Sequence, residues 1–417
     1  MKALYKIKNL STPTFLLMIL LATSFLFRTI RLSNPSIYIF DEVYHVPTIR
    51  AYSQNNPQGY EYWQKAPEPN TAYDWLHPPL AKLFQAGSIK ILGDNSLAWR
   101  LPSAIFGTAS IAALYFLALT IFKNQKIALL SAAIFSLDGL QLTMSRITMN
   151  DIFLTTWLIF TLKFFYQFLT TKTKTKTKKY LYLTGLFTGL SLATKHSAIL
   201  LYPIFAFWLL PQLIKSKSKF RFFLSLNLNL ILLPLLIYFL SYTQFFLQGH
   251  TLEQFKQLHQ QIYWYQTNLS ATHDYQSKAW QWPLLIRPVW FHVKYFPNKI
   301  ANIYNFGNPA IFWGGLVAVF YTLAQKLTKK TAYLFISYFI LFFPFVFSPR
   351  IMFLHHYLPA LSILPIIISQ AIYKQKKLTI YYLILTAILF LFFYPINTAI
   401  PIPKRLLKYF FWFPTWK

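Results

Sequence analysis

The sequence contains no cysteine, few charged residues and few glycines, and each shortage excludes a class of protein or site. Without cysteine there are no disulfides, thiolate metal ligands or cysteine nucleophiles. Charged residues make up 12% of the 417 residues, against about 25% in an average soluble domain, which excludes an ordinary cytosolic enzyme and a disordered chain. The 11 glycines form no glycine-rich phosphate loop, so we expect no nucleotide-binding domain.

Acidic residues are scarce, and the chain is strongly basic. It has 10 Asp and Glu against 40 Lys and Arg, for a net charge of +30. Such a balance also occurs in nucleic-acid-binding proteins, which carry it on polar domains. Here the basic residues lie between apolar runs, so we expect no nucleic-acid partner and an excess charge that faces the lipid surface.

Long apolar runs dominate the chain, which is 55% hydrophobic and 20% aromatic. A bilayer-spanning helix needs roughly 17–25 mostly apolar residues. We predict about eleven such spans. They are 14–27, 101–122, 127–144, 151–169, 180–194, 198–213, 222–242, 310–325, 332–347, 356–373 and 379–394. The first has no small-residue cleavage site after it, so we interpret it as a retained anchor and not as a cleavable signal peptide.

Six short basic runs predict the orientation of the spans. They are 2–8, 123–126, 172–179, 215–221, 326–330 and 374–377. With eleven spans and a cytoplasmic N-terminus, all six face the cytoplasm, as the positive-inside rule requires. None contains Asp or Glu, so all the acids lie on the outer side or within spans.

Two long segments, 28–99 and 243–308, then lie on the outer side. Both are rich in Pro, Trp and Tyr, and we expect amphipathic helices on the membrane face. No internal repeat of the kind found in many transporters is visible. We therefore predict one all-α polytopic membrane domain over residues 1–417, located in the plasma membrane.

Polar residues interrupt the apolar pattern mainly where the predicted spans reach the outer face. These residues are Asp41, Glu42, His77, Arg100, Arg146, Asp151, Lys195, His196, Arg350, His355 and His356. Charges brought to one depth by distant spans suit an active site at the membrane face. A proton-coupled transporter would place ionisable groups near the bilayer midplane.

The segment IYIFDEVYHVP (37–47) is the most suggestive of these clusters. A carboxylate among Ile, Phe, Val and Tyr costs free energy unless it is paired. Adjacent residues point about 100° apart on a helix, so only one of Asp41 and Glu42 can face a given substrate atom. We expect one to act as general base and the other to be structural or to bind a cation. The alternative is an exposed acidic pair at a helix start.

The other candidates also have structural alternatives. His77 precedes a Pro-Pro turn into a helix, where it either takes part in catalysis or caps and packs the turn; Lys82 should then lie on the surface of that helix. Arg100 by default extends toward lipid headgroups. Asp151 is equally a helix N-cap. Asp138 lies inside the third span and needs a partner that the sequence does not identify.

In order along the chain, these motifs resemble those of the protein O-mannosyltransferase family, the dolichyl-phosphate-mannose–protein mannosyltransferases. The matching segments are FDEVYHV (40–46), LHPPLAKL (76–83), GDNSLAWRLPSAIFG (93–107), SRITMNDIFL (145–154), GLFTGLSLATKHSA (185–198), WQWPLLIRPVWF (280–291) and MFLHHYLPALS (352–362). No single motif suffices, but the ordered set covers most of the chain.

The resemblance implies a C-type glycosyltransferase fold with eleven spans and an active site on the outer face. It implies transfer of mannose, or a related hexose, from a polyprenyl-phosphate donor to Ser or Thr of exported proteins, with inversion. Asp41 would be the base and Glu42 would order the site, while Arg100 and Arg146 would bind the lipid phosphate. From their place at the outer ends of spans, we add as substrate-binding candidates His77, Asp151, Lys195, Arg350 and His356.

The departures from the family pattern leave the sugar open. The family often has Lys-Trp where this chain has Lys195-His196, and Leu-Leu-Asp where it has residues 149–151. The second outer segment is too short for the β-trefoil domain of eukaryotic members, which implies a bacterial or archaeal form. We predict no metal ligand set or cofactor beyond the lipid-linked donor, although a divalent metal stays open, as does an association with the export machinery.

Two other functions compete with this interpretation. A transferase of the same fold, similar to the lipid A aminoarabinose transferases, would glycosylate a lipid or a glycan. A transporter is disfavoured by the depth of the charges and by the absence of repeats. The identity of the acceptor therefore separates the two enzymatic readings.

Overall fold

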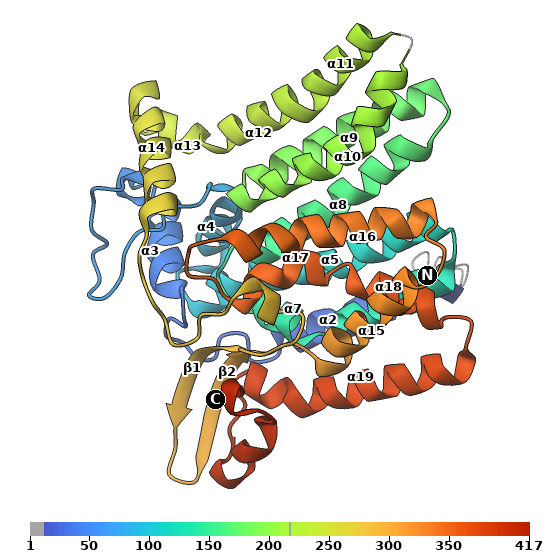
Figure 1. Cartoon of the computed structure of the whole chain (residues 1–417). Helices are drawn as coiled ribbons and strands as arrows, with labels where there is room; N and C mark the ends of the chain where they lie inside the picture. The colour runs from blue at the N-terminus through green and yellow to red at the C-terminus, as the bar shows by residue number, and fades with distance from the viewer. Residues whose placement is uncertain (1–11, 217) are drawn as a thin grey trace, which may run out of the picture.

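Helices form most of the described chain, which in this computed structural model comprises residues 12–216 and 218–417. The predicted cytoplasmic run 2–8 and Lys217 lie outside the described residues. Figure 1 shows the long helices side by side, with α3, α4, α14 and a β-hairpin gathered at one end of them.

In the first half of the chain the helices are α2 (Thr12–Thr29), α3 (Glu42–Ser53), α4 (Leu80–Leu92), α5 (Ser96–Phe122), α6 (Gln125–Ser136), α7 (Gly139–Met144), α8 (Asp151–Thr170), α9 (Lys174–Leu192) and α10 (Leu201–Lys215). In the second half they are α11 (Lys219–Asn227), α12 (Leu233–Ser241), α13 (Thr243–Leu247), α14 (Leu252–Asn268), α15 (Pro309–Leu323), α16 (Lys329–Phe342), α17 (Leu358–Leu361), α18 (Leu364–Ile372) and α19 (Lys376–Asn397). The strands are β1 (Val289–Tyr295), β2 (Lys299–Asn305) and β3 (Ile402–Pro403).

Among the described residues, seven helical segments are long and apolar enough to cross a membrane. They are α2, α5, α8, His196–Lys215, Lys219–Ser241, Lys329–Phe347 and α19. Helices α6 and α15 are apolar but shorter. All eleven predicted runs are largely helical, so the prediction of a helical multi-pass membrane protein is confirmed, while the number eleven stays a prediction.

The predicted third span, 127–144, is not one continuous helix. It breaks between α6 and α7 at Asp138, whose carboxylate accepts hydrogen bonds from the backbone N–H groups of Gln141 at 2.8 Å and Asn308 at 3.1 Å. Asp138 is thus the N-cap of α7, where a carboxylate satisfies free backbone donors. The partner that this buried acid requires is main chain, which a residue pattern does not reveal.

Close packing of helices builds the centre of the bundle. Helix α8 packs against α5 and α9, and α9 packs against α12. At Gly185 of α9, a Cβ atom would lie 1.8 Å from the backbone oxygen of Asn229. A small residue is therefore required where these two backbones approach, as is common between membrane helices.

The second outer segment differs from the prediction of helices alone. Helix α14 fits that prediction, because it buries Leu258 and Ile262 and exposes its other side. Strands β1 and β2, however, form an antiparallel hairpin, and β3 pairs with β2. The prediction is wrong here because β1, with the sequence VWFHVKY, is rich in the β-branched and aromatic residues that favour strands.

Candidate active site

A cavity of about 610 Å³ lies where the two outer segments meet the ends of the helices. The wall is formed by the acidic loop before α3, the turn before α4, the start of α8, the segment between α9 and α10, helix α14 and the segment before α17. The predicted site residues that line it are Asp41, His77, Asp151, Lys195, Arg350 and His356. Those that do not line it are Glu42, Arg100 and Arg146.

Asp41 lines the cavity from the turn that starts α3. Its carboxylate makes no hydrogen bond or ion pair to any described residue. The preceding residue, Phe40, has a φ of 47°, which is uncommon for a bulky side chain. The Phe40 ring stacks on Phe291 of β1 at 4.3 Å. The hairpin thereby holds the backbone that presents Asp41.

The surroundings of Asp41 favour its protonated form. Burial raises the pKa of the Asp41 carboxyl to about 7, and the negative charges of Asp74 and Asp151 act in the same direction. The ammonium group of Lys195 opposes them by lowering that pKa. An unpaired carboxylate with a pKa near neutrality is suited to act as a general base.

Glu42 points away from the cavity and forms a buried ion pair with Arg100. The Arg100 Nη2 lies 2.6 Å from Glu42 Oε2, and Nε lies 2.8 Å from Oε1. Arg100 is 1% exposed and also donates to the backbone oxygens of Leu32, Pro35 and Ile37. The prediction that Arg100 faces the lipid phosphate is therefore wrong, because its guanidinium is fully engaged within the protein.

Glu42 also receives two backbone hydrogen bonds. The N–H of Ile39 lies 3.1 Å from Oε2, and the N–H of Thr148 lies 3.0 Å from Oε1. Glu42 therefore joins the acidic loop, α5 and the segment before α8. This geometry supports the ordering role expected of Glu42 and gives it no contact with the cavity.

Arg146 is likewise buried outside the cavity. Its Nη1 donates to the backbone oxygens of Phe27 at 3.1 Å, Arg28 at 2.7 Å and Ile30 at 2.9 Å. These carbonyls end α2, where the last turn of a helix leaves acceptors without helical partners. Arg146 therefore caps α2, and the prediction that it lines the donor pocket is wrong.

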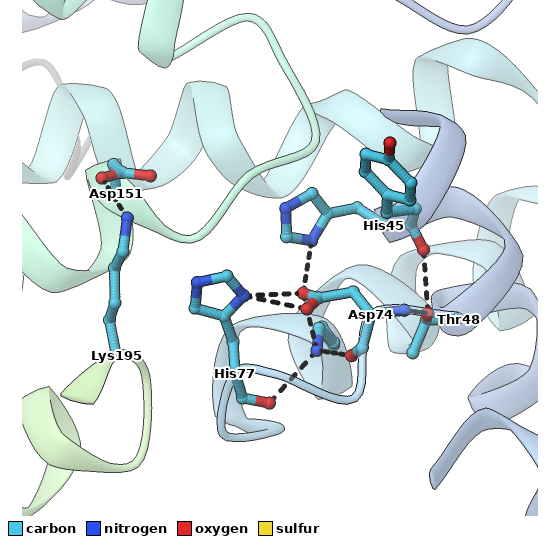
Figure 2. A network of polar contacts seen from close by, with 8 residues as sticks. His45, Thr48, Asp74, His77, Asp151 and Lys195 are labelled. Carbon is cyan, nitrogen blue, oxygen red and sulfur yellow. Dashed lines mark hydrogen bonds and ion pairs between the residues drawn. The ribbon is translucent and has the colours of Figure 1, made fainter. Parts of the chain in front are cut away.

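A cluster of four buried or half-buried side chains adjoins the cavity, and Figure 2 shows Asp74 between His45 and His77 of this cluster. Asp74 is at its centre: one of its oxygens lies 2.9 Å from His77 Nδ1, and the other lies 2.9 Å from Lys82 Nζ and 3.1 Å from His45 Nδ1. Although burial raises the pKa of the Asp74 carboxyl, its contact with His77 and the charge of Lys82 hold that pKa well below its usual range. Burial lowers the pKa of His45 to about 3, so His45 is neutral.

Lys82 lies inside this cluster and not on the surface of α4. Its side chain is 0% exposed, and it also donates to the backbone oxygen of His77 at 3.2 Å. The expectation of a surface position is wrong because Asp74 provides a buried countercharge. Sequence reasoning missed Asp74, whose one visible signal is an acid three residues before His77.

Another part of the wall is cationic. Lys195 Nζ lies 2.7 Å from Asp151 Oδ1, at the first residue of α8. Arg350 makes no ion pair with any described residue, and its buried Nε has no hydrogen-bond partner. His356 also lines the cavity. Both cations line the same cavity, and an unpaired guanidinium can bind a phosphate.

The cavity also contains residues that sequence reasoning did not select. Helix α14 contributes His259, Tyr263 and Gln266. It is held against α12 by a contact of 2.6 Å between Tyr238 Oη and His259 Nε2. Asn150 lines the cavity, is 1% exposed, and neither carboxamide atom has a partner among the described residues. No local pattern distinguishes these residues from ordinary helix positions, because the fold alone brings them together.

Among the described residues, no group of three or more His, Cys, Asp or Glu side chains is placed to hold one metal ion. The absence of a metal from the reaction stays a prediction. The residues that face the cavity can supply a base, hydrogen-bond donors and acceptors, and positive charge.

Curated relatives are protein mannosyltransferases. The chain is 23% identical to the polyprenol-phosphate-mannose–protein mannosyltransferase of Corynebacterium glutamicum, over 91% of this chain and 88% of the relative. It is 29% identical to dolichyl-phosphate-mannose–protein mannosyltransferase 5 of Candida albicans, over 34% of this chain and 25% of the relative.

Solved structures share the fold. The chain matches the Saccharomyces cerevisiae protein O-mannosyltransferase Pmt1-Pmt2 complex bound to the sugar donor with a TM-score of 0.82 at 13% identity, over 98% of this chain and 93% of the other. It matches ArnT from Cupriavidus metallidurans bound to undecaprenyl phosphate with a TM-score of 0.61 at 13% identity, over 88% and 61%. The prediction of a C-type glycosyltransferase fold is confirmed.

Two protein-family models match neighbouring parts of the chain. Residues 76–241 match the model described as dolichyl-phosphate-mannose-protein mannosyltransferase. Residues 251–416 match the C-terminal four-transmembrane region of protein-O-mannosyltransferase. The two models leave only 1–75, a short joint and the last residue unmatched, and the chain belongs to the protein O-mannosyltransferase family.

Proposed function

We propose that the protein transfers a mannose or related hexose from a polyprenyl-phosphate donor to Ser or Thr hydroxyls of exported proteins. One observation carries the proposal: the unpaired carboxylate of Asp41 shares a cavity with the unpaired guanidinium of Arg350. The first is a base for the acceptor hydroxyl, and the second is a ligand for the leaving phosphate. The family of the chain and the names of its relatives support the substrates.

Asp41 acts on the nucleophile. As the Ser or Thr oxygen attacks the anomeric carbon, the hydroxyl proton passes to the carboxylate of Asp41. The bond between that carbon and the phosphate oxygen breaks, and the polyprenyl phosphate leaves. A displacement in line inverts the anomeric configuration. General-base help is typically worth about 10²–10⁴-fold.

Arg350 and Lys195 act on the leaving group. Negative charge grows on the phosphate oxygen as the glycosidic bond breaks, and cationic donors fixed in place stabilise it. Lys195 is already paired with Asp151, which holds its ammonium group at the cavity wall. Arg350 has no such partner among the described residues, which leaves its guanidinium available for the phosphate.

The site suits a lipid-linked donor better than a nucleotide sugar. The cavity lies at the helix ends that we predict from the positive-inside rule to face away from the cytoplasm and its nucleotide sugars. We therefore propose a plasma-membrane enzyme with an extracytoplasmic site.

The alternative acceptor is a lipid or a glycan, and the fold that the chain shares with ArnT is compatible with it. Mass spectrometry of membrane proteins and lipids from cells with and without this gene separates the two. Loss of hexose from Ser and Thr of exported proteins, restored by the parental gene and not by Asp41→Asn, supports the proposal. Loss of the sugar from a lipid alone would overturn it.

A further inference from the structure

His77 has one ring nitrogen committed to Asp74 and one left for a ligand. Its Nδ1 lies 2.9 and 3.0 Å from the two oxygens of the Asp74 carboxylate. The side chain is 25% exposed, and it lines the cavity. Figure 2 shows the second nitrogen of the ring pointing away from Asp74, toward the side of the site that holds Asp151 and Lys195.

The contact with Asp74 selects the tautomer of His77. An ionised carboxylate only accepts hydrogen bonds, so the nitrogen that faces it carries the proton. Lys82 Nζ, 2.9 Å from Asp74, already balances the charge of this carboxylate. A neutral imidazole therefore suffices, with its proton on Nδ1 and an unprotonated Nε2 facing the cavity.

We propose that His77 Nε2 accepts a hydrogen bond from a hydroxyl of the donor hexose, and that Asp74 is the positioning residue that makes it an acceptor. A phosphodiester has no proton to offer such a nitrogen, whereas every sugar hydroxyl has one. His77 thus selects the sugar and does not bind the phosphate. This inference rests on the proposed use of a lipid-linked hexose.

The surrounding residues support this division of tasks. The phosphate has cationic partners elsewhere, in Arg350 and Lys195. The neighbouring ring, His45, is neutral and 4% exposed, so it adds no positive charge beside His77. A sugar bound between Asp41 and Lys195 would lie next to His77, because all three line the same cavity.

Two substitutions of His77 test the roles of its two ring nitrogens separately. In His77→Asn the amide nitrogen occupies about the place of Nδ1, so the contact with Asp74 is kept and the acceptor is lost. In His77→Gln the amide reaches about the place of Nε2, so an acceptor oxygen is restored to the cavity. Each variant is purified in nanodiscs and checked for an unchanged thermal midpoint; if one fails to fold, the other gives the comparison.

The assay measures kcat/KM for polyprenyl-phosphate mannose and for its four monodeoxy analogues, with one Ser/Thr peptide. In the parental enzyme, kcat/KM for one analogue should be at least ~10-fold below that for the full donor, because that analogue lacks a hydroxyl that the site pairs. In His77→Asn that analogue and the full donor should be used equally, and His77→Gln should restore part of the difference. An equal penalty in the parent and in His77→Asn would overturn the proposal.

A fluorine in place of the sensitive hydroxyl tests the direction of the bond. Fluorine accepts a hydrogen bond weakly and donates none, so the deoxyfluoro donor should show the same coupling to His77 as the deoxy donor. If fluorine removes the coupling, Nε2 carries a proton and the assigned tautomer is wrong. Failure of the parental enzyme to use any polyprenyl-phosphate hexose would instead defeat the proposed function itself.

Discussion

The pH dependence of transfer should report the ionisation of Asp41. The base must be deprotonated to act, and burial together with the nearby Asp74 raises its pKa to about 7. Activity is therefore lost as the pH falls through about 7. With a pKa of about 7, the ionised fraction is roughly one half at pH 7, one tenth at pH 6 and one hundredth at pH 5. An aspartate of ordinary pKa, about 3.9, would remain more than 90% ionised over that range.

The measurement is kcat/KM for the acceptor peptide between about pH 5 and 8.5, since this ratio reports ionisations of the free enzyme. We expect a slope of about tenfold per pH unit below pH 7 and a plateau above it. The donor is a phosphodiester and does not titrate in this range. Glu253→Gln is the matched control, because Glu253 is an exposed acid on α14 whose ion-pair partner is Lys256. Its profile should coincide with that of the parent.

A flat profile between pH 5 and 8 would refute this reasoning. It would mean either that Asp41 is not the base or that water and substrate reach its carboxylate and restore an ordinary pKa. A profile that rises as the pH falls would indicate an essential proton donor in place of a base.

Four other predictions follow from the same contacts. Asp41→Asn should abolish transfer. At pH values above 7 it should also raise the thermal midpoint of unfolding, because the parent must there keep a buried carboxylate ionised. Arg100→Ala and Arg100→Lys should both reduce the yield of folded protein, because breaking a buried ion pair costs about 3–5 kcal/mol, without a selective change in donor KM. Arg350→Ala should raise the donor KM by about 10–100-fold, with Arg350→Lys in between. An impermeant thiol reagent on intact cells should label a cysteine placed at Thr267 and spare one at Thr175; the reverse would overturn the assigned orientation.

Hydropathy predicted where the helices lie because burial of apolar runs in lipid depends on local composition. It could not predict the break at Asp138, whose capping partner Asn308 is 170 residues away. Hydropathy also did not predict the hairpin of β1 and β2, because its signal is the β-branched and aromatic composition of β1 and not an apolar run. The membrane-spanning pattern is local, whereas the cap of Asp138 depends on a tertiary contact.

The candidate site was predictable in part, for the same reason. Asp41 stands out as an acid in an apolar segment, and the structure places it at the cavity. Arg100 looked equally functional, but its charge neutralises Glu42 inside the protein. A sequence gives the charge of a residue and not the direction of its side chain. Asp74 was missed because its importance comes from His45, His77 and Lys82, which the fold assembles around it.

The most direct test of the account is a single reconstituted transfer reaction. The parental enzyme and Asp41→Asn, each in nanodiscs, receive labelled polyprenyl-phosphate mannose or labelled GDP-mannose together with a Ser/Thr peptide. We predict that only the parental enzyme forms glycopeptide, only from the lipid-linked sugar, and with the anomeric configuration opposite to that of the donor. Glycopeptide formed from GDP-mannose without lipid, or formed at near-parental rate by Asp41→Asn, would contradict the account.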